Sequence, residues 1–156
     1  MYSNKLVCDL LGYIDINLNR KITIDELEKH FYYNKYYIMK LFKKEIGVTI
    51  FDYINILRIN NSINEIKNTD NSFTLISINN GFYSLEYFSE TFKKVTGVNP
   101  RTFKKFWIYH SNIKETDETT IRNTLVYLDE LTEKVDKYRK NLKPSKTPVR
   151  KLTIFK

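Results

Sequence analysis

The sequence has few of the residues that cross-link or interrupt a chain: one cysteine, four glycines and three prolines among 156 residues. The single Cys8 cannot form an internal disulfide, which favours a reducing compartment. It stands among leucines and a valine, so we expect a small buried hydrophobe rather than a reactive thiol. The scarcity of glycine and proline predicts a mostly helical chain with few breaks.

Long hydrophobic runs are also missing from the sequence. No apolar segment approaches the roughly 18 residues that a transmembrane helix requires. The N-terminus lacks the basic segment followed by an apolar one that marks an export signal. We therefore expect a cytoplasmic protein without a membrane partner.

The residue sets that enzymes use are absent as well. His30 and His110 are the only histidines, and the sequence has no glycine-rich phosphate loop and no cluster with metal-ligand spacing. His30 is better explained as a structural or solvated side chain than as a catalytic one. We therefore predict that the protein is not an enzyme and binds no metal or cofactor.

The chain is basic, with a formal net charge of +8 and an isoelectric point near 9.4, which favours an acidic partner such as nucleic acid. This charge is unevenly distributed. Residues 1–107 have a net charge of +4, residues 108–133 a net charge of −4 and residues 134–156 a net charge of +8. The excess charge alone therefore does not show that the first two thirds of the chain bind nucleic acid.

An internal repeat organises the first two thirds of the chain. Residues 34–48, NKYYIMKLFKKEIGV, return fifty residues later at 84–98, SLEYFSETFKKVTGV. The Phe-Lys-Lys motif and the following Gly-Val recur at the same spacing, and Ile38 and Phe88 have the same helical phase. Two copies of one small helical unit are the simplest interpretation.

Periodic apolar residues and capping signals predict an all-α fold. Thr23 with Glu26 forms a capping box, Thr49 with Asp52 is another capping pair, and Gly47 suits the position after a helix. We predict two helix-turn-helix units, at 5–48 and 73–109, joined by a linker helix at 49–68. The predicted helices cover residues 4–18, 24–31, 35–46, 49–67, 74–80, 85–96 and 100–109.

The C-terminal third has a different organisation. Residues 110–118 are polar and predict a linker, and 119–143 predict one amphipathic helix. Its apolar residues allow two outcomes: packing against the same chain, or a homodimer contact. Residues 144–156 are either a basic tail or the start of a further domain. The apolar residues of the helix are Ile121, Leu125, Leu128, Leu131, Val135, Tyr138 and Leu142.

The segments FKKEIGV and GFYSLEYFSETFKKVTGVNPRTFKK resemble the signature of the AraC/XylS family of bacterial transcription regulators. The resemblance covers residues 6–107, the whole DNA-binding domain of that family. It implies two helix-turn-helix subdomains joined by a long helix. It also implies that the recognition helices, 35–46 and 85–96, enter successive major grooves of double-stranded DNA. The function implied is sequence-specific transcription regulation.

The outer faces of the two predicted recognition helices are the candidate base-reading surfaces. Lysine can donate to guanine, and tyrosine or methionine can contact thymine methyl groups. The backbone amides at helix starts, side-chain hydroxyl groups and basic side chains are suited to binding phosphates. The base-contact candidates are Lys35, Tyr36, Met39 and Lys40 in the first helix and Leu85, Glu86, Ser89 and Glu90 in the second. The phosphate-contact candidates are Lys43, Lys44, Thr49, Lys93, Lys94, Arg101, Lys104 and Lys105.

Several residues depart from the family pattern. Glu90 stands where an arginine is common, and phosphates repel a carboxylate there unless it accepts from a cytosine amine. Glu28 replaces a small residue, Tyr32 replaces the turn glycine, and Asn80 replaces an apolar residue. We expect the first unit to be the main base reader. The alternative is a protein-interaction module of the same fold that binds RNA polymerase or another regulator.

Overall fold

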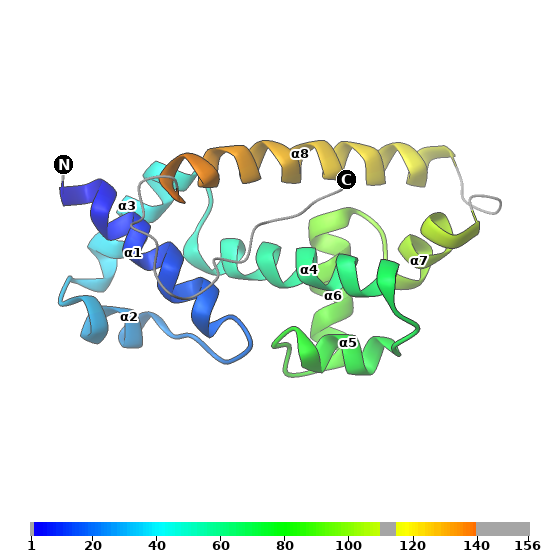
Figure 1. The fold of residues 1–156 in the computed structure, drawn as a ribbon, viewed down its shortest axis with the longest axis horizontal. Coiled ribbons are helices and arrows are strands. Elements are labelled where there is room, and N and C mark those ends of the chain that lie inside the picture. The colour runs from blue at the N-terminus through cyan, green and yellow to red at the C-terminus, as the bar shows by residue number, and fades with distance from the viewer. Residues whose placement is uncertain (1, 110–114, 140–156) are drawn as a thin grey trace. The chain divides into compact units, whose positions relative to one another are not determined.

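The computed structural model describes residues 2–109 and 115–139, and the described residues form eight helices and no strand (Figure 1). The all-α prediction is confirmed. The helices are α1 Tyr2–Asn17, α2 Ile24–Phe31, α3 Lys35–Ile46, α4 Ile50–Asn68, α5 Phe73–Asn79, α6 Leu85–Thr96, α7 Pro100–Tyr109 and α8 Glu115–Arg139.

The described residues fall into two compact units. The first contains residues 2–54 and 131–139, and the second contains residues 55–109 and 115–130. Both α4 and α8 therefore contribute residues to each unit. No helix within these ranges is long and apolar enough to cross a membrane.

The first unit contains the first helix-turn-helix, in which α3 contacts both α1 and α2 (Figure 1, blue to cyan). The capping box predicted at Thr23 is present, because its hydroxyl accepts from the Glu26 amide at 3.2 Å. Gly47 ends α3 in the left-handed conformation, with φ of 95°. The inner face of α3 is buried as its apolar spacing predicts, and Phe42 contacts Tyr53 of α4.

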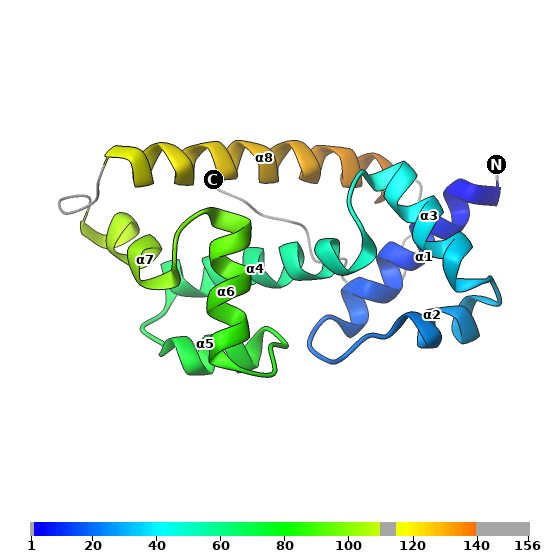
Figure 2. The same cartoon turned by 180° about the vertical axis from the view of Figure 1, so that it is seen from behind.

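The second unit repeats this arrangement with α5 and α6, followed by α7 (Figure 2). Phe88, Phe92 and Phe103 form a chain of ring contacts in its core, with centroids 5.7 and 5.6 Å apart. Asn99 caps α7 by accepting from the Thr102 amide at 2.8 Å. The core of this unit contains more aromatic rings than that of the first.

The predicted C-terminal helix starts earlier than expected. It begins at Glu115 rather than at 119, so the predicted linker at 110–118 is wrong from Glu115 onward. Acidic side chains stabilise a helix N-terminus, and Glu118 also pairs with Arg122 at 2.8 Å. A polar segment was therefore mistaken for a linker. Residues 110–114 and 140–156 lie outside the described part of the chain.

One face of α8 is integrated into the fold of this chain. Ile121, Leu128, Leu131 and Val135 are buried. Within the second unit, the Thr124 hydroxyl donates to the Thr96 carbonyl at 3.1 Å, at the end of the recognition helix α6. Packing against the same chain, one of the two outcomes expected for this helix, is therefore seen for these residues.

Candidate nucleic-acid interface

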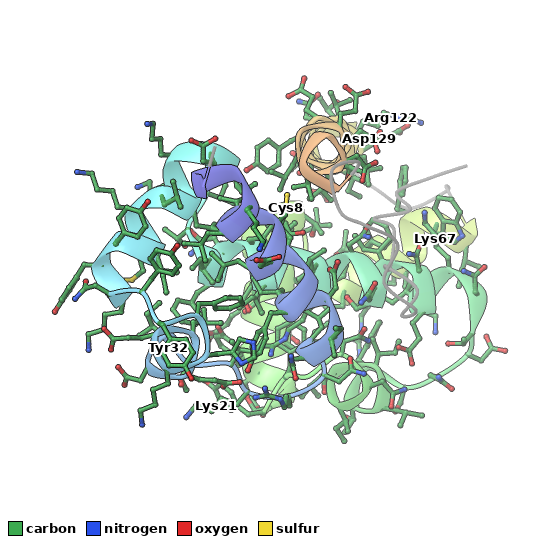
Figure 3. All side chains as sticks on the ribbon, turned by 60° about the vertical axis from the view of Figure 1, so that its left-hand side comes forward. Cys8, Lys21, Tyr32, Lys67, Arg122 and Asp129 are labelled. Atoms are coloured by element: carbon green, nitrogen blue, oxygen red, sulfur yellow. The ribbon has the colours of Figure 1, made fainter. Side chains whose placement is uncertain are left out.

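The turn of the first unit keeps the helix-turn-helix geometry without a glycine. Tyr32 follows α2 with φ of 57° and ψ of 33°, in the left-handed region. This conformation costs a residue with a side chain about 1–2 kcal/mol. The ring is 93 % exposed, so no packing of the ring offsets this cost. Tyr32, labelled in Figure 3, therefore has a strained left-handed backbone.

Glu28 has a definite role at the start of α3. Its Oε1 accepts a hydrogen bond from the backbone amide of Lys35, the first residue of α3, at 3.0 Å. The Asn34 side chain accepts from the next amide, that of Tyr36, at 2.9 Å. Two otherwise unsatisfied amides are thus bonded, and the carboxylate also interacts favourably with the positive end of the helix dipole. Glu28 therefore stabilises the recognition helix from α2.

The outer face of α3 carries the four residues predicted to contact bases. Tyr36 is 67 % exposed, Lys40 is exposed, and Lys35 and Met39 are half-buried. The Lys35 ammonium lies 3.1 Å from a carboxylate oxygen of Asp25, and this hydrogen bond raises the pKa of Lys35. Tyr36, Met39 and Lys40 are therefore presented outward, whereas Lys35 is held partly by α2.

The turn of the second unit has a different set of contacts. Gly81 takes the left-handed conformation, with φ of 82°. Ser77, at the position equivalent to Glu28, is buried and donates to the Thr74 carbonyl at 2.7 Å. Asn80, which occupies an apolar position of the family pattern, is buried and donates to Glu65 at 2.9 Å. Glu65 also accepts hydrogen bonds from the side chains of Asn71 and Asn79. One carboxylate therefore binds the side-chain amides of three asparagines.

The outer face of α6 differs from that of α3 in charge. Leu85, Glu86 and Glu90 are exposed, and Ser89 is half-buried. Glu86 and Glu90 form no ion pair with any described residue. This face therefore presents two unneutralised carboxylates at the position where α3 presents Tyr36 and Lys40.

The phosphate-contact candidates lie near helix ends, except for Lys104 and Lys105 in the middle of α7. Thr49 caps α4 by accepting from the Asp52 amide at 3.1 Å. Arg101 and Lys105 are exposed on α7, and the Lys104 ammonium lies over the Phe73 ring at 5.7 Å. The remaining candidates are exposed in the last turns of the two recognition helices: Lys43, Lys44, Lys93 and Lys94.

Sequence reasoning missed one pair of tyrosines that is present in both units. Tyr33 stacks on Tyr37 with ring centroids 5.7 Å apart, and Tyr83 stacks on Tyr87 at 4.7 Å. Tyr87 is also held by α4, because the Asn55 amide donates to its hydroxyl at 3.1 Å. A signal was present in the sequence: Tyr-Asn-Lys-Tyr-Tyr and Tyr-Ser-Leu-Glu-Tyr occupy equivalent places in the repeat.

Trp107 differs from the other large aromatic residues of α7. It is 37 % exposed, whereas Phe103 and Phe106 are buried. The Lys67 ammonium lies 4.2 Å from the centroid of its indole (Lys67 is labelled in Figure 3). Burial lowers the pKa of Lys67 to about 8. The α4–α7 contact of the second unit is thus partly a cation–π contact.

Comparison with known proteins identifies the class. Residues 27–105, half of the chain, match the helix-turn-helix domain family, and the chain belongs to it. Its fold is that of solved AraC-type DNA-binding domains, and the curated proteins that it resembles in sequence are transcriptional regulators.

Three similar proteins support this assignment. The melibiose operon regulatory protein of Escherichia coli strain K12 is 32 % identical over 99 residues, which are 64 % of this chain and 33 % of that protein. An AraC-type transcriptional regulator from Chromobacterium violaceum has a similar structure, with a TM-score of 0.61 at 20 % identity over 69 % of this chain and 96 % of that chain. The DNA-binding domain of the transcriptional factor AdpA, solved with a target DNA, gives 0.62 at 13 % identity over 69 % and 97 %. The last two likenesses concern the fold alone.

The match to the longer relative is partial. The chain spans about a third of the length of the melibiose operon regulatory protein. The family match ends at residue 105, so α8 lies beyond the matched domain.

Proposed function

We propose that this chain binds double-stranded DNA at specific sequences and regulates transcription, with α3 as the main base-reading helix. The observation that carries the proposal is the outward face of α3 in an AraC-type domain: Tyr36, Met39 and Lys40 project from a helix whose N-terminus is fixed by Asn34 and Glu28. A helix that presents a lysine donor, a tyrosine ring and a methionine suits the major groove. The cytoplasm is the compartment this function requires.

The second unit has the weaker case for base reading. Glu86 and Glu90 project from α6 without a neutralising partner among the described residues. Phosphates line the major groove, so these carboxylates disfavour DNA unless they accept from cytosine amines. We therefore assign α6 mainly to backbone contacts, with little base reading.

A selection experiment followed by two charge variants tests this assignment. The wild-type protein is used to select sites from a random duplex library, and affinity is then measured for a selected site and a scrambled one. Lys40→Met should weaken binding to the selected site about tenfold and reduce the preference over the scrambled site. Glu90→Arg should strengthen binding to both DNAs. Lys21→Met, which removes an exposed lysine outside the recognition helices, is the control.

Two results would contradict the proposal. If the selection enriches no sequence, the protein does not bind DNA at specific sequences. A Glu90→Arg protein that loses affinity only for a cytosine-containing site would show that α6 reads bases directly.

A second candidate function is a protein-interaction module that contacts RNA polymerase or another regulator. The exposed acidic face of α6, with Leu85 beside Glu86, favours it. The two functions differ in a mobility-shift assay at low and moderate salt, because only a DNA-binding regulator keeps its sequence preference as salt weakens the phosphate contacts.

A homodimer through residues 119–143 is a further proposal for the same chain. The buried Ile121 and Leu128 do not support a dimer seam on that face, so a dimer would use exposed residues such as Val126 and Tyr127. The predicted contributions of Tyr138 and Leu142 lie outside the described side chains. Sedimentation equilibrium of the wild type and of Val126→Lys measures the association directly.

A further inference from the structure

The same tyrosine pair precedes and enters both recognition helices. Tyr33 and Tyr83 stand immediately before the capping residues Asn34 and Ser84, and each ring lies against a tyrosine in the first turn of the helix. The interplanar angles are 23° and 15°, so both pairs are stacked rather than edge-on. This geometry occurs in both units although the turns differ in length by two residues, since residues 32–34 form the first turn and residues 80–84 the second.

Stacking explains the rings but not their hydroxyl groups. An apolar contact between the residue before the cap and the first turn stabilises a helix start, and phenylalanine would serve as well. Tyr83 is nevertheless 83 % exposed and Tyr33 is 41 % exposed. Neither hydroxyl forms a hydrogen bond with any described residue. Each unit therefore has a free donor beside its recognition helix.

The position of these tyrosines in the chain indicates what they bind. Each immediately precedes the capping residue of a recognition helix, at the end of the helix where the dipole has its positive partial charge. Stacking on Tyr37 and Tyr87 restricts ring rotation, so less conformational entropy is lost when the hydroxyl is used. In the second unit, Asn55 further fixes Tyr87 through its hydroxyl at 3.1 Å. A fixed, uncharged donor beside a groove-binding helix suits a phosphate oxygen.

We infer that Tyr33 and Tyr83 are positioning residues that donate hydrogen bonds to DNA phosphates flanking the groove entered by each recognition helix. This assignment rests on the proposed DNA-binding function and deepens it. It also provides the second unit with a backbone contact that does not depend on the charge of α6, where Glu86 and Glu90 oppose phosphate binding.

A neutral donor has a distinct signature in salt. Each lysine that neutralises a phosphate releases condensed counterions and adds about 0.9 to the slope of log affinity against log salt. A tyrosine hydroxyl releases none. Loss of the hydroxyl should therefore reduce affinity at every salt concentration by the same factor, whereas loss of a lysine should reduce the slope.

The experiment uses the full chain and a mixed-sequence duplex of about 30 base pairs, because phosphate contacts are independent of sequence. Affinity is measured by fluorescence anisotropy at several salt concentrations for Tyr33→Phe, Tyr83→Phe and the double variant. Each single change should weaken binding about fivefold to tenfold, with the salt slope unchanged and the thermal midpoint unchanged because the rings still stack. Lys43→Met is the reference for a changed slope. Tyr32→Phe, which removes the hydroxyl of an exposed tyrosine outside both stacked pairs, is the matched control.

The possible results separate this inference from the proposed function. If the wild type binds the duplex and both phenylalanine variants bind equally well, the tyrosine rings only stabilise the first turn of each helix and the inference fails. A change in salt slope without a change in affinity at low salt would also overturn it. If the wild type binds no duplex, the proposed function fails and the assignment fails with it.

Discussion

The two helix-turn-helix units each have a left-handed residue in the turn, but the residue and its surroundings differ. In the first, Tyr32 takes the left-handed turn at φ of 57° and Glu28 bonds the first amide of α3. In the second, Gly81 takes the turn at φ of 82°, and a serine occupies the position of Glu28. The comparison teaches that packing of the two helices determines the turn, and that a residue with a poor intrinsic fit is tolerated when contacts nearby compensate.

The units also differ in how their charges are used. On α2, Asp25 pairs with Lys35, Glu26 pairs with Arg20 and Glu28 bonds the amide of Lys35. On α6, Glu86 and Glu90 have no such partners among the described residues. The acids of the first unit therefore serve its structure, while those on the second recognition helix are available to a partner.

The largest predicted effect concerns the end of α6. Gly97 has φ of 83°, and a Cβ added there would collide with the Thr120 methyl group of α8. Gly97→Ala should lower the free energy of unfolding by about 2–4 kcal/mol, since the left-handed backbone and the collision both contribute. Urea denaturation measures the change. Thr120→Ser in the same chain should recover part of the loss.

Gly12 provides the matched control in the first unit. It lies within α1, and a Cβ there meets nothing within 4 Å. Gly12→Ala should stabilise the protein by about 0.5–1 kcal/mol, because alanine is the better helix former. Equal effects of the two substitutions would contradict the close approach of α8 to Gly97.

The second prediction separates the two helix starts. Glu28→Ala leaves the Lys35 amide without its acceptor and should cost about 1–2 kcal/mol. Glu28→Gln keeps a hydrogen-bond acceptor and loses only the interaction of the charge with the helix dipole, so it should cost about a few tenths of a kcal/mol. Ser84→Ala, which removes the cap that accepts from the Tyr87 amide at 3.0 Å, should cost about 1 kcal/mol. A negligible effect of Glu28→Ala would show that Asn34 alone fixes the start of α3.

The third prediction exchanges the turn residues. Tyr32→Gly relieves the left-handed strain and should raise stability by about 1 kcal/mol or less, because glycine also gains entropy in the unfolded chain. Gly81→Ala imposes the strain on the second unit and should lower stability by about 1 kcal/mol. Thermal denaturation followed by circular dichroism measures both. Destabilisation by Tyr32→Gly would mean that the tyrosine side chain contributes more than its backbone costs.

A fourth prediction concerns the acid stability of the first unit. Hydrogen bonds from Arg20 and Tyr13 lower the pKa of Glu26 to about 2. A carboxyl with a lowered pKa in the folded state stabilises the fold above its ordinary pKa, near 4.5, and this contribution is lost as pH falls towards 2. The urea midpoint should therefore fall with acid in the wild type and fall less in Glu26→Gln. If the urea midpoints of the two proteins change with pH in parallel, Glu26 is not the cause of the acid sensitivity.

The smallest predicted effect is the alkaline counterpart in the second unit. Burial lowers the pKa of Lys67 from 10.5 to about 8, so the unfolded chain binds more protons than the folded one between these pH values. Stability should rise with pH across this window and be insensitive to this group below pH 8. Lys67→Met should abolish that part of the slope.

The same group has an optical readout. Trp107 is the single tryptophan, and the Lys67 ammonium lies against its indole. Its fluorescence should change with a midpoint near pH 8 in the wild type, as the ammonium loses its proton. A fluorescence titration with no transition near that pH would contradict the lowered pKa.

How much of the site could be predicted depends on how far apart in the sequence the interacting residues lie. Capping at Thr23 and Thr49 was predicted because each involves residues three apart in the chain. The bond from Lys35 to Glu28 and the bond from Asn55 to Tyr87 join residues 7 and 32 apart. No local pattern determines which of several polar side chains makes such a contact. The roles assigned to the base and phosphate candidates remain predictions.

By itself, the sequence determined the all-α fold, the repeated unit and the charge contrast between α3 and α6, because helical periodicity, caps and exposed charge are local properties of the chain. Only the tertiary structure decided that Tyr32 keeps the left-handed turn, that Glu28 bonds the start of α3, that α8 packs at the end of α6 and that Trp107 lies under Lys67. Each of these depends on which helices pack together, and packing selects among contacts that the sequence allows equally.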